Sequence, residues 1–376
     1  MLFDFWYTVC HIVDVRWQCA IMRLVMSCAF LFLPSINHGD TTKNEEENMK
    51  VTMRKCILSA CAGLLAFGGL VQTASALEVV FAISAKPGST QYITAEEFTR
   101  RANELLGDKA KVVFYGSSQL GNDKDLMQKL KLGTVHLAMP SSIMSSIAPE
   151  AGLFDMPFLV KDRAHLNRIE HKVFWPMIAP AIEAKGYKVI GFWENGIRHI
   201  TNNVKPINTP DDLKGVKIRT PKSTWRVKMF TAWGANPTPM SFSEVFVALQ
   251  TGVIDGQENP FTNIYGAKLN EVQKYVSITG HVYTPSYLTT GASQWGKLPE
   301  DVRQILEKTA VDVQGWMYAT GTMDDMALRT KLGESMEVNI ADRAAFVEAS
   351  KPIYAEFAKE VPSAKEMIDI SLQLAQ

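Results

Sequence analysis

Short apolar runs alternate with longer amphipathic stretches from residue 77 onwards, and this alternation constrains the fold more than any other feature. The apolar runs have the length of strands and lie at 79–83, 112–115, 135–139, 189–193, 216–220 and 253–255. The amphipathic stretches have helical periodicity and lie at 90–106, 123–132, 164–184, 224–233, 241–251, 299–331, 341–360 and 363–374. This order predicts an α/β fold with largely parallel sheets. The segment is longer than one comfortable hydrophobic core, so we expect two lobes.

Local signals place several ends of the predicted helices. Ser241, with Glu244 three residues later, forms a capping box before the helix at 241–251. Pro176 and Pro180 predict a break within the stretch at 164–184. Glycines, which are typical C-terminal caps, follow the helices at 90–106, 123–132 and 241–251, at Gly107, Gly133 and Gly252.

The N-terminal region reads as targeting sequence. Residues 53–55 are basic at two positions, 56–71 are uncharged and mostly apolar or small, and 74–76 form an Ala-x-Ala cleavage signal. This layout predicts a Sec signal peptide at 49–76, a mature chain that begins at Leu77, and a periplasmic location. The apolar run is shorter than the roughly 20 residues of a membrane span. We interpret residues 1–48 as an upstream extension of the gene start, although a cytoplasmic regulatory extension is the alternative.

Composition excludes several classes of function. The 39 basic residues balance the 39 acidic ones, so a nucleic-acid binder with a broad basic surface is not expected. All five cysteines lie in the first 61 residues, which leaves 77–376 without a disulfide, a zinc–thiolate site or a cysteine nucleophile. The histidines show no metal-binding spacing, and no phosphate-binding loop or nucleophile elbow is present. We therefore expect that the protein holds no metal ion or cofactor and that it is not an enzyme.

Arg219 lies near the carboxyl end of the predicted strand at 216–220, which Pro221 stops. Val216 and Ile218 alternate with two cations, so the cations face away from the apolar pair. Ligands of open α/β sheets bind beyond the carboxyl ends of strands, and an arginine there can hold a carboxylate with two parallel hydrogen bonds. The alternative is an ordinary surface salt bridge.

Two further strand ends carry polar side chains. Glu258 and Asn259 follow the predicted strand at 253–255, and both could face the same crevice as Arg219. The alternative is a turn capped by Asp255 and Asn259. Arg198 follows the strand at 189–193, where it is either another ligand contact or a surface ion pair.

Longer motifs carry a family resemblance. Residues 217–221 (Lys-Ile-Arg-Thr-Pro), 234–246 and 248–260, which ends in Asp-Gly-Gln-Glu-Asn-Pro, resemble the DctP-type solute-binding proteins of TRAP (tripartite ATP-independent periplasmic) transporters. Residues 116–121 (Gly-Ser-Ser-Gln-Leu-Gly) also resemble a motif of that family. The resemblance covers the whole of 77–376.

The resemblance implies a two-lobed periplasmic binding-protein fold, with the ligand in a cleft between the lobes. It divides the chain into lobe I, at 77–197 plus about 285–324, and lobe II, at 198–284 plus about 325–376. The long helical stretch at 299–331 matches the helix that bridges both lobes. The implied function is to bind a small organic acid and deliver it to the small and large membrane subunits of a TRAP transporter. We expect a monomer.

The resemblance also implies roles for single residues. Arg219 matches the arginine that holds the ligand carboxylate, and Asn259 matches a hydrogen-bond partner of that carboxylate. Phe242 matches an aromatic residue that packs on the ligand, and Arg198 matches a second cationic contact.

The chain departs from the sialic-acid-binding members at three places. Lys222 and Ser84 stand where those members have asparagines, and Ser141 or Ser142 stands in place of a glutamate. The hydrogen-bonding set for a sialic acid is therefore not reproduced. Lys222 adds a positive charge near Arg198 and Arg219, which predicts a dianionic or compact acid such as a C4-dicarboxylate or a sugar acid. The alternative is that Lys222 points into solvent.

Two other functions remain open at this point. One is a periplasmic enzyme acting on small carboxylates, with Arg219 as substrate clamp and Glu258 as general base, although no nucleophile, metal set or cofactor motif accompanies Glu258. The other is a receptor that presents its ligand to a membrane sensor.

Overall fold

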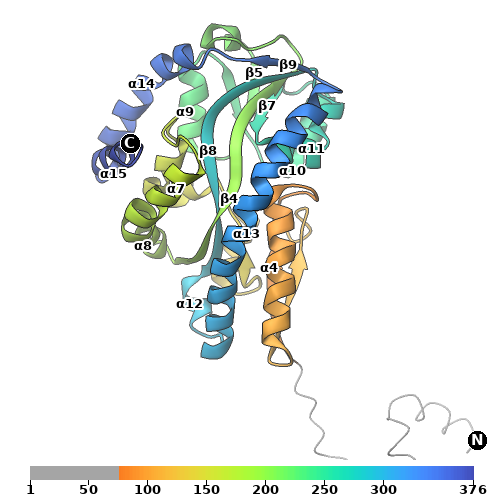
Figure 1. Cartoon of the computed structure of the whole chain (residues 1–376), viewed down its shortest axis with the longest axis vertical. Helices are drawn as coiled ribbons and strands as arrows, with labels where there is room; N and C mark the ends of the chain where they lie inside the picture. Colours follow the sequence, from red (N-terminus) through yellow and green to blue (C-terminus); the bar gives the residue numbers. More distant parts are fainter. Residues whose placement is uncertain (1–75) are drawn as a thin grey trace, which may run out of the picture. The chain divides into compact units, whose positions relative to one another are not determined.

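The computed structural model describes residues 76–376, apart from the side chains of 322–324, and Figure 1 draws them in colour from α4 near the start to α15 at the end. The range 76–376 denotes these described residues throughout. The extension interpreted at 1–48 and the signal peptide predicted at 49–76, apart from Ala76, lie outside the described residues. No helix within 76–376 combines the length and the hydropathy needed to span a membrane.

One nine-stranded sheet runs through the described residues in the order β2-β1-β3-β8-β4-β7-β5-β6, with β9 beside β8. The strands are β1 Leu77–Ala82, β2 Ala110–Tyr115, β3 Leu137–Ala138, β4 Tyr187–Asn202, β5 Lys217–Thr220, β6 Asn236–Pro239, β7 Gly256–Asn259, β8 Tyr275–Gly291 and β9 Glu337–Ile340. β1 is parallel to β2 and β3, and β5 is parallel to β6 and β7. The prediction of a largely parallel sheet is wrong at the centre, because β4 pairs antiparallel with both β7 and β8.

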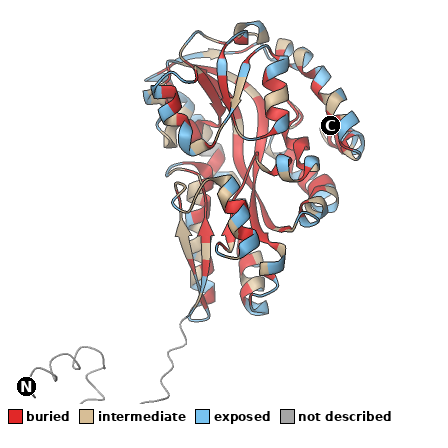
Figure 2. Ribbon diagram, turned by 180° about the vertical axis from the view of Figure 1, so that it is seen from behind, coloured by how far each residue is buried: buried red, intermediate tan, exposed pale blue. Residues whose placement is uncertain are grey.

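The long strands β4 and β8 lie side by side and connect the two halves of the sheet (Figure 1). The sequence predicted only 189–193 of β4 and did not identify β8, β6 or β9. Figure 2 shows the reason, since β4 and β8 are buried along most of their length. A strand covered on both faces shows no alternation of apolar and polar residues, and the polar residues Glu194, Asn195 and Arg198 made its second half look like a loop.

The predicted helices are present with small shifts at their ends. The α-helices are α4 Thr90–Leu106, α5 Asp123–Leu132, α6 Met144–Ile147, α7 Arg163–Ile169, α8 Ala179–Glu183, α9 Thr224–Ala232, α10 Phe242–Gln250, α11 Phe261–Gly266, α12 Ala292–Trp295, α13 Glu300–Gly333, α14 Arg343–Glu360 and α15 Ala364–Gln373. Short 3-10 or π segments are η1 Pro149–Asp155, η2 Glu170–Ile178, η3 Pro210–Leu213 and η4 Leu269–Glu271. The capping box of α10 is confirmed, because the Ser241 N–H donates to the Glu244 carboxylate at 2.9 Å.

Two predicted details are wrong. The stretch at 164–184 does not break at its prolines: α7, the π-helical η2 and α8 follow one another, and the wider π-turn accommodates Pro176. Residues 253–255 are not a strand, and Val253 is 61% exposed. The strand is β7, which begins at Gly256, so the polar residues Glu258 and Asn259 lie within a strand instead of after one.

The hydrophobic core is divided, which gives the two-lobed architecture its physical basis. One cluster joins β1, α4 and the first half of α13, through residues such as Val79, Phe98 and Leu306. Another joins α10 and α11, through residues such as Val245 and Ile264. The 34-residue α13 packs against α4 and β4 and also against α11 and β9, so it bridges both lobes as expected. The residue boundaries of the lobes stay a prediction.

Candidate ligand-binding site

A cavity of about 60 Å³ lies where β1, β5 and β7 end. It has room for the centres of about four to six water molecules. Six of the seven predicted site residues line it, and Glu258 does not. The lining residues come from both halves of the sheet and are Ser84, Gln91, Asn122, Asp123, Lys124, Ser141, Ser142, Ile143, Asn195, Arg198, Arg219, Pro221, Lys222, Met240, Ser241, Phe242, Asn259 and Asn263.

Arg219 is only 3% exposed and has no carboxylate within salt-bridge distance among the described residues. Its Nε and one terminal nitrogen, Nη2, both donate to the Met240 carbonyl, at 3.1 and 2.8 Å. The other terminal nitrogen, Nη1, donates no hydrogen bond within 76–376. Burial lowers the pKa of Arg219 to about 10, which still leaves the guanidinium charged at neutral pH. A buried cation that faces a cavity without a partner is costly, and an anionic ligand would remove that cost.

Phe242 and Lys222 flank this arginine. The Phe242 ring, in the first turn of α10, has its centroid 5.9 Å from the Arg219 guanidinium carbon. Lys222 is exposed at the cavity, and its Nζ makes no ion pair among the described residues. Its backbone is fixed, because the Ser146 hydroxyl donates to the Lys222 carbonyl at 2.9 Å.

Ser84 meets a carboxylate that the sequence analysis missed. Its hydroxyl donates to Asp123 at 2.5 Å, and both residues line the cavity. Burial raises the pKa of Asp123, against the opposing effects of the Ser84 hydrogen bond and the charges of Arg219 and Lys222. The cavity therefore holds one acidic group among its cations.

Arg198 occupies another part of the cavity wall, and in contrast to Arg219 it is paired. It lies in β4 and donates two hydrogen bonds to the Glu258 carboxylate, one from Nε and one from Nη2, the latter at 2.9 Å. Nη2 also donates to the Asn259 side chain at 3.0 Å. Nη1 donates to no residue in the described part of the chain.

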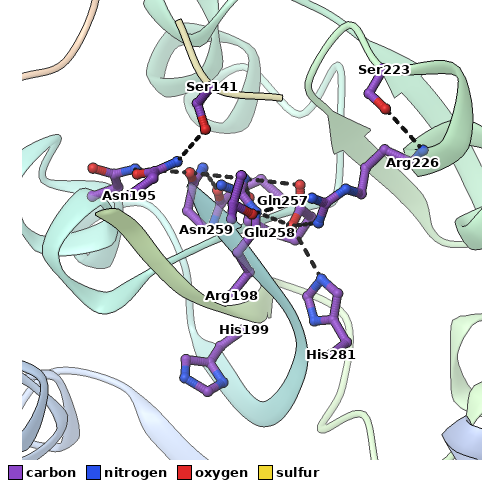
Figure 3. Close-up of polar contacts among 12 residues, drawn as sticks. Ser141, Asn195, Arg198, His199, Ser223, Arg226, Gln257, Glu258, Asn259 and His281 are labelled. Atoms are coloured by element: carbon purple, nitrogen blue, oxygen red, sulfur yellow. Dashed lines mark hydrogen bonds and ion pairs between the residues drawn. The ribbon is translucent and has the colours of Figure 1, made fainter. Parts of the chain in front are cut away.

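Glu258 lies behind the cavity wall and is fully buried. Besides Arg198, it contacts Arg226 of α9 at 3.2 Å and His281 of β8 at 3.1 Å (Figure 3). Burial by itself raises the pKa of Glu258, but the charges of Arg198 and Arg226 outweigh burial and hold the pKa well below its usual range. Such a carboxylate stays ionised and is a poor proton acceptor, which argues against its role as a general base.

Asn259 ends β7 and lines the cavity beside Arg198. Its oxygen accepts from Arg198 and from Asn263, at 3.0 and 3.2 Å, and its nitrogen donates to Gln257 at 2.5 Å. Both ends of the amide are therefore oriented by neighbours, and one N–H remains for a ligand.

Two buried histidines near the site are neutral at pH 7. Burial lowers the pKa of His281 to about 4 and that of His199 to about 3. In Figure 3 the ring of His199 points away from the arginine cluster. It stacks on Phe261 with ring centroids 4.1 Å apart.

The sequence analysis missed several polar residues, among them Asp123, Asn195 and Asn263 in the cavity wall and Arg226 behind it. A signal existed for two of them. Asp123 comes directly after the 116–121 motif and Asn122, at the start of a predicted helix, and Asn263 lies one helical turn after Asn259. Asn195 and Arg226 carried none, because each lies in a segment where a polar residue is ordinary. Across 76–376, no group of three or more histidine, cysteine or acidic side chains could hold a metal ion.

Comparison with known proteins gives a consistent result. The profile of the family described as "Bacterial extracellular solute-binding protein, family 7" (DctP) matches residues 81–360. The chain is 32% identical over 311 residues to the 2,3-diketo-L-gulonate-binding periplasmic protein YiaO of Escherichia coli. The aligned region covers 82% of this chain and 94% of that protein.

Two solved structures are similar over most of this chain. One is a TRAP periplasmic solute-binding protein from Polaromonas sp. JS666 bound to D-erythronate, with a TM-score of 0.74 and 31% identity, covering 78% of this chain and 98% of that one. The other, from Sulfurospirillum deleyianum, contains succinate and has a TM-score of 0.75 and 31% identity, covering 79% of this chain and 98% of that one.

Proposed function

Because the chain belongs to the DctP family of bacterial extracellular solute-binding proteins, a family of receptors and not of enzymes, we propose that its cavity binds a small organic acid through Arg219. The acid is a C4-dicarboxylate, a sugar acid or a similar carboxylate. After binding it, the receptor delivers the acid to the small and large membrane subunits of a TRAP transporter.

The observation that carries this proposal is the guanidinium of Arg219, which is buried at a cavity without a carboxylate partner in the described residues. Nη1 of Arg219 is left to donate to a ligand oxygen, and Arg198, which lines the same cavity, also has an Nη1 without an acceptor in the described residues. A ligand carboxylate in this place would receive charge-assisted hydrogen bonds from rigid donors. The known ligands of the similar proteins, 2,3-diketo-L-gulonate, D-erythronate and succinate, are all carboxylates.

Arg219 alone does not account for useful affinity. A hydrogen bond to a charged group contributes about 1.5–3 kcal/mol net, whereas micromolar binding requires about 8 kcal/mol. Enclosure by Phe242 and donation by Arg198 and Asn259 supply the rest. The lobes enclose the ligand when they close, and the ligand stabilises the closed state by its higher affinity for that state.

Two residues near the opening discriminate between classes of acid. Lys222 favours a ligand with a second negative charge. Asp123 accepts hydrogen bonds, so it favours a hydroxyl group and disfavours a second carboxylate. Their balance contributes to the choice between a dicarboxylate and a sugar acid, and both belong to the proposed class.

Export completes the proposal. Relatives such as YiaO are periplasmic. We infer that this protein reaches the same compartment by cleavage after Ala76 and acts there as a monomer. N-terminal sequencing of the exported protein tests the cleavage site, and a start other than Leu77 would contradict it.

A thermal-shift screen of the exported protein tests the function. The panel contains C4-dicarboxylates, sugar acids, 2-oxo acids, sialic acid, sulfonates and neutral sugars. A ligand at 100 times its Kd stabilises the fold by about 2.7 kcal/mol. We expect a shift with one class of acid that is lost in Arg219→Lys, because lysine keeps the charge and loses the planar fork. A shift with neutral compounds only, or one that the variant retains, would overturn the assignment of Arg219.

A further inference from the structure

Three buried arginines and two buried carboxylates lie at or behind the wall of the cavity. Arg198, Arg219 and Arg226 are 2%, 3% and 0% exposed, and Glu258 and Asp155 are 0% and 2% exposed. His281, which also contacts Glu258, is neutral because burial lowers its pKa to about 4. The buried cluster therefore carries one surplus positive charge, which equals the charge of one ligand carboxylate.

The surplus depends on two residues that do not line the cavity. Arg226 lies in the first turn of α9 and bridges both carboxylates: one terminal nitrogen, Nη2, is 2.9 Å from Asp155, and the other, Nη1, is 3.2 Å from Glu258. Nη2 also donates to Thr284 at 3.3 Å. Arg226 thus reaches the ligand cavity only through Glu258, which holds Arg198.

Asp155 is held as firmly as its partner. It ends η1, and its second oxygen accepts a hydrogen bond of 2.6 Å from Ser223, the N-cap residue of α9. The Ser145 hydroxyl in turn donates to Ser223 at 3.0 Å. These contacts fix Asp155 against α9, the helix that carries Arg226, so the positions of both side chains are set by the fold.

The charges at the opening do not remove the surplus. Asp123 lies there, half-buried, and the opposite charges of Arg219 and Lys222 both act on it. Lys222 and Lys124 at the same place are exposed to water, so the residues at the opening carry no net negative charge. Exposed charges are screened far more than buried ones. The net charge of the buried cluster therefore determines what the deep end of the cavity accepts.

We propose that Asp155 and Arg226 form a charge-balancing pair that holds the buried cluster at one surplus positive charge, so that the deep end of the cavity accepts one ligand carboxylate. The pair thereby sets the preference between mono- and dicarboxylates. This inference rests on the proposed function, because it concerns the acid that Arg219 holds.

Charge-changing variants test the pair by isothermal titration calorimetry, with D-erythronate as the monocarboxylate and succinate as the dicarboxylate. If the unaltered protein binds neither, the acids that shift it most in the thermal screen replace them. Asp155→Asn leaves two surplus charges, and we expect the ratio Kd(monocarboxylate)/Kd(dicarboxylate) to rise about tenfold. Arg226→Gln leaves none, and the ratio should fall about tenfold. The double variant restores one surplus charge and should return the ratio to within about threefold of its original value.

The ratio separates charge balance from a merely structural role. If the pair only supports Glu258, each single variant weakens both acids equally and the ratio stays constant, which overturns the inference. Asp155→Asn alone decides this if Arg226→Gln does not fold, because the amide is nearly the same size as the carboxylate. Arg163→Gln is the matched control, since Arg163 pairs with the buried Glu194 and neither lines the cavity. Its ratio should not change, and a tenfold change would also overturn the inference.

The unaltered protein separates the two proposals. If it binds no acid of the panel, the proposed function fails and the inference fails with it. If it binds acids through Arg219 but the ratio does not respond to Asp155 and Arg226, only the inference fails.

Discussion

Arg219 and Arg198 line the same cavity and are almost equally buried, yet only Arg198 has a carboxylate partner. Arg198 belongs to a buried network with Arg226, Glu258 and Asp155, in which two arginines and two carboxylates balance one another. Arg219 donates only to the Met240 carbonyl. The comparison shows that a buried charge does not by itself mark a binding site. We propose that the site is marked by a buried charge that the protein leaves for another molecule to balance.

The comparison predicts different costs when each arginine is removed. Arg198→Met leaves the Glu258 carboxylate without its bidentate partner, and breaking a buried pair in this way costs about 3–5 kcal/mol of unfolding free energy. Urea denaturation without ligand measures this cost. The matched control is Lys228→Met, because Lys228 pairs with two carboxylates on the surface, Glu356 and Glu360. Its loss should cost at most about 1 kcal/mol. If both variants lose the same unfolding free energy, the buried ion pairs of Arg198 contribute no more to stability than the surface ion pairs of Lys228.

Acid should weaken the paired network before it affects the unpaired arginine. The pKa values of His281 and His199 are lowered to about 4 and about 3 by burial, from an ordinary value of 6.5. Between pH 6.5 and 4 the unfolded chain therefore binds more protons than the folded one. The free energy of unfolding should fall by about 1.4 kcal/mol per pH unit for each histidine as the pH decreases, and it should be fully restored above pH 6.5.

Urea denaturation at pH 7, 6 and 5 measures this slope, and His281→Gln should remove about half of it. The affinity of the folded protein for an organic acid that is ionised should stay nearly constant over the same pH range. A flat stability profile would mean that the two histidines are not kept neutral by the fold.

Arg219→Met should separate binding from stability. We expect the affinity for organic acids to fall on the order of 100-fold, since the principal charge-assisted contact is lost. The free energy of unfolding without ligand should change by less than about 1 kcal/mol, because the substitution also removes an unpaired buried charge. Lys217→Met, on the same strand but exposed, is the control for both measurements and should change neither. A large loss of stability in Arg219→Met would place Arg219 in the structural network.

Lys222→Ala should have the smallest effect. We expect the affinity for dicarboxylates to fall about threefold, since an exposed charge is screened by salt. Affinity for monocarboxylates should not change. Calorimetry with succinate and D-erythronate measures both affinities. If Lys222→Ala has the same affinity as the unaltered protein for every acid, Lys222 points into solvent.

Much of the fold follows from local sequence, because helix periodicity and end signals are properties of neighbouring residues. The helices at 90–106 and 123–132 agree with α4 and α5, and the strand at 216–220 agrees with β5 within one residue. The motif around Arg219 also placed a cation at the end of a strand, where the structure has it. What the local signals did not show is β8, since a strand buried on both faces loses the alternation that identifies strands.

The sequence by itself identified Arg198, Arg219, Lys222 and Glu258 as charged residues of the candidate site. Only the tertiary structure added Asp123, Asp155 and Arg226 and decided which of these charges are balanced. Arg198 and Arg219 look alike in the sequence, since both lie next to apolar residues of a strand. Glu258 meets Arg198 because β7 pairs with β4, and it meets His281 and Arg226 because β8 and α9 pack against the same place. These partners lie between 23 and 60 residues from Glu258 along the chain. Electrostatic balance depends on distance in space and on burial, and neither can be read from the order of residues.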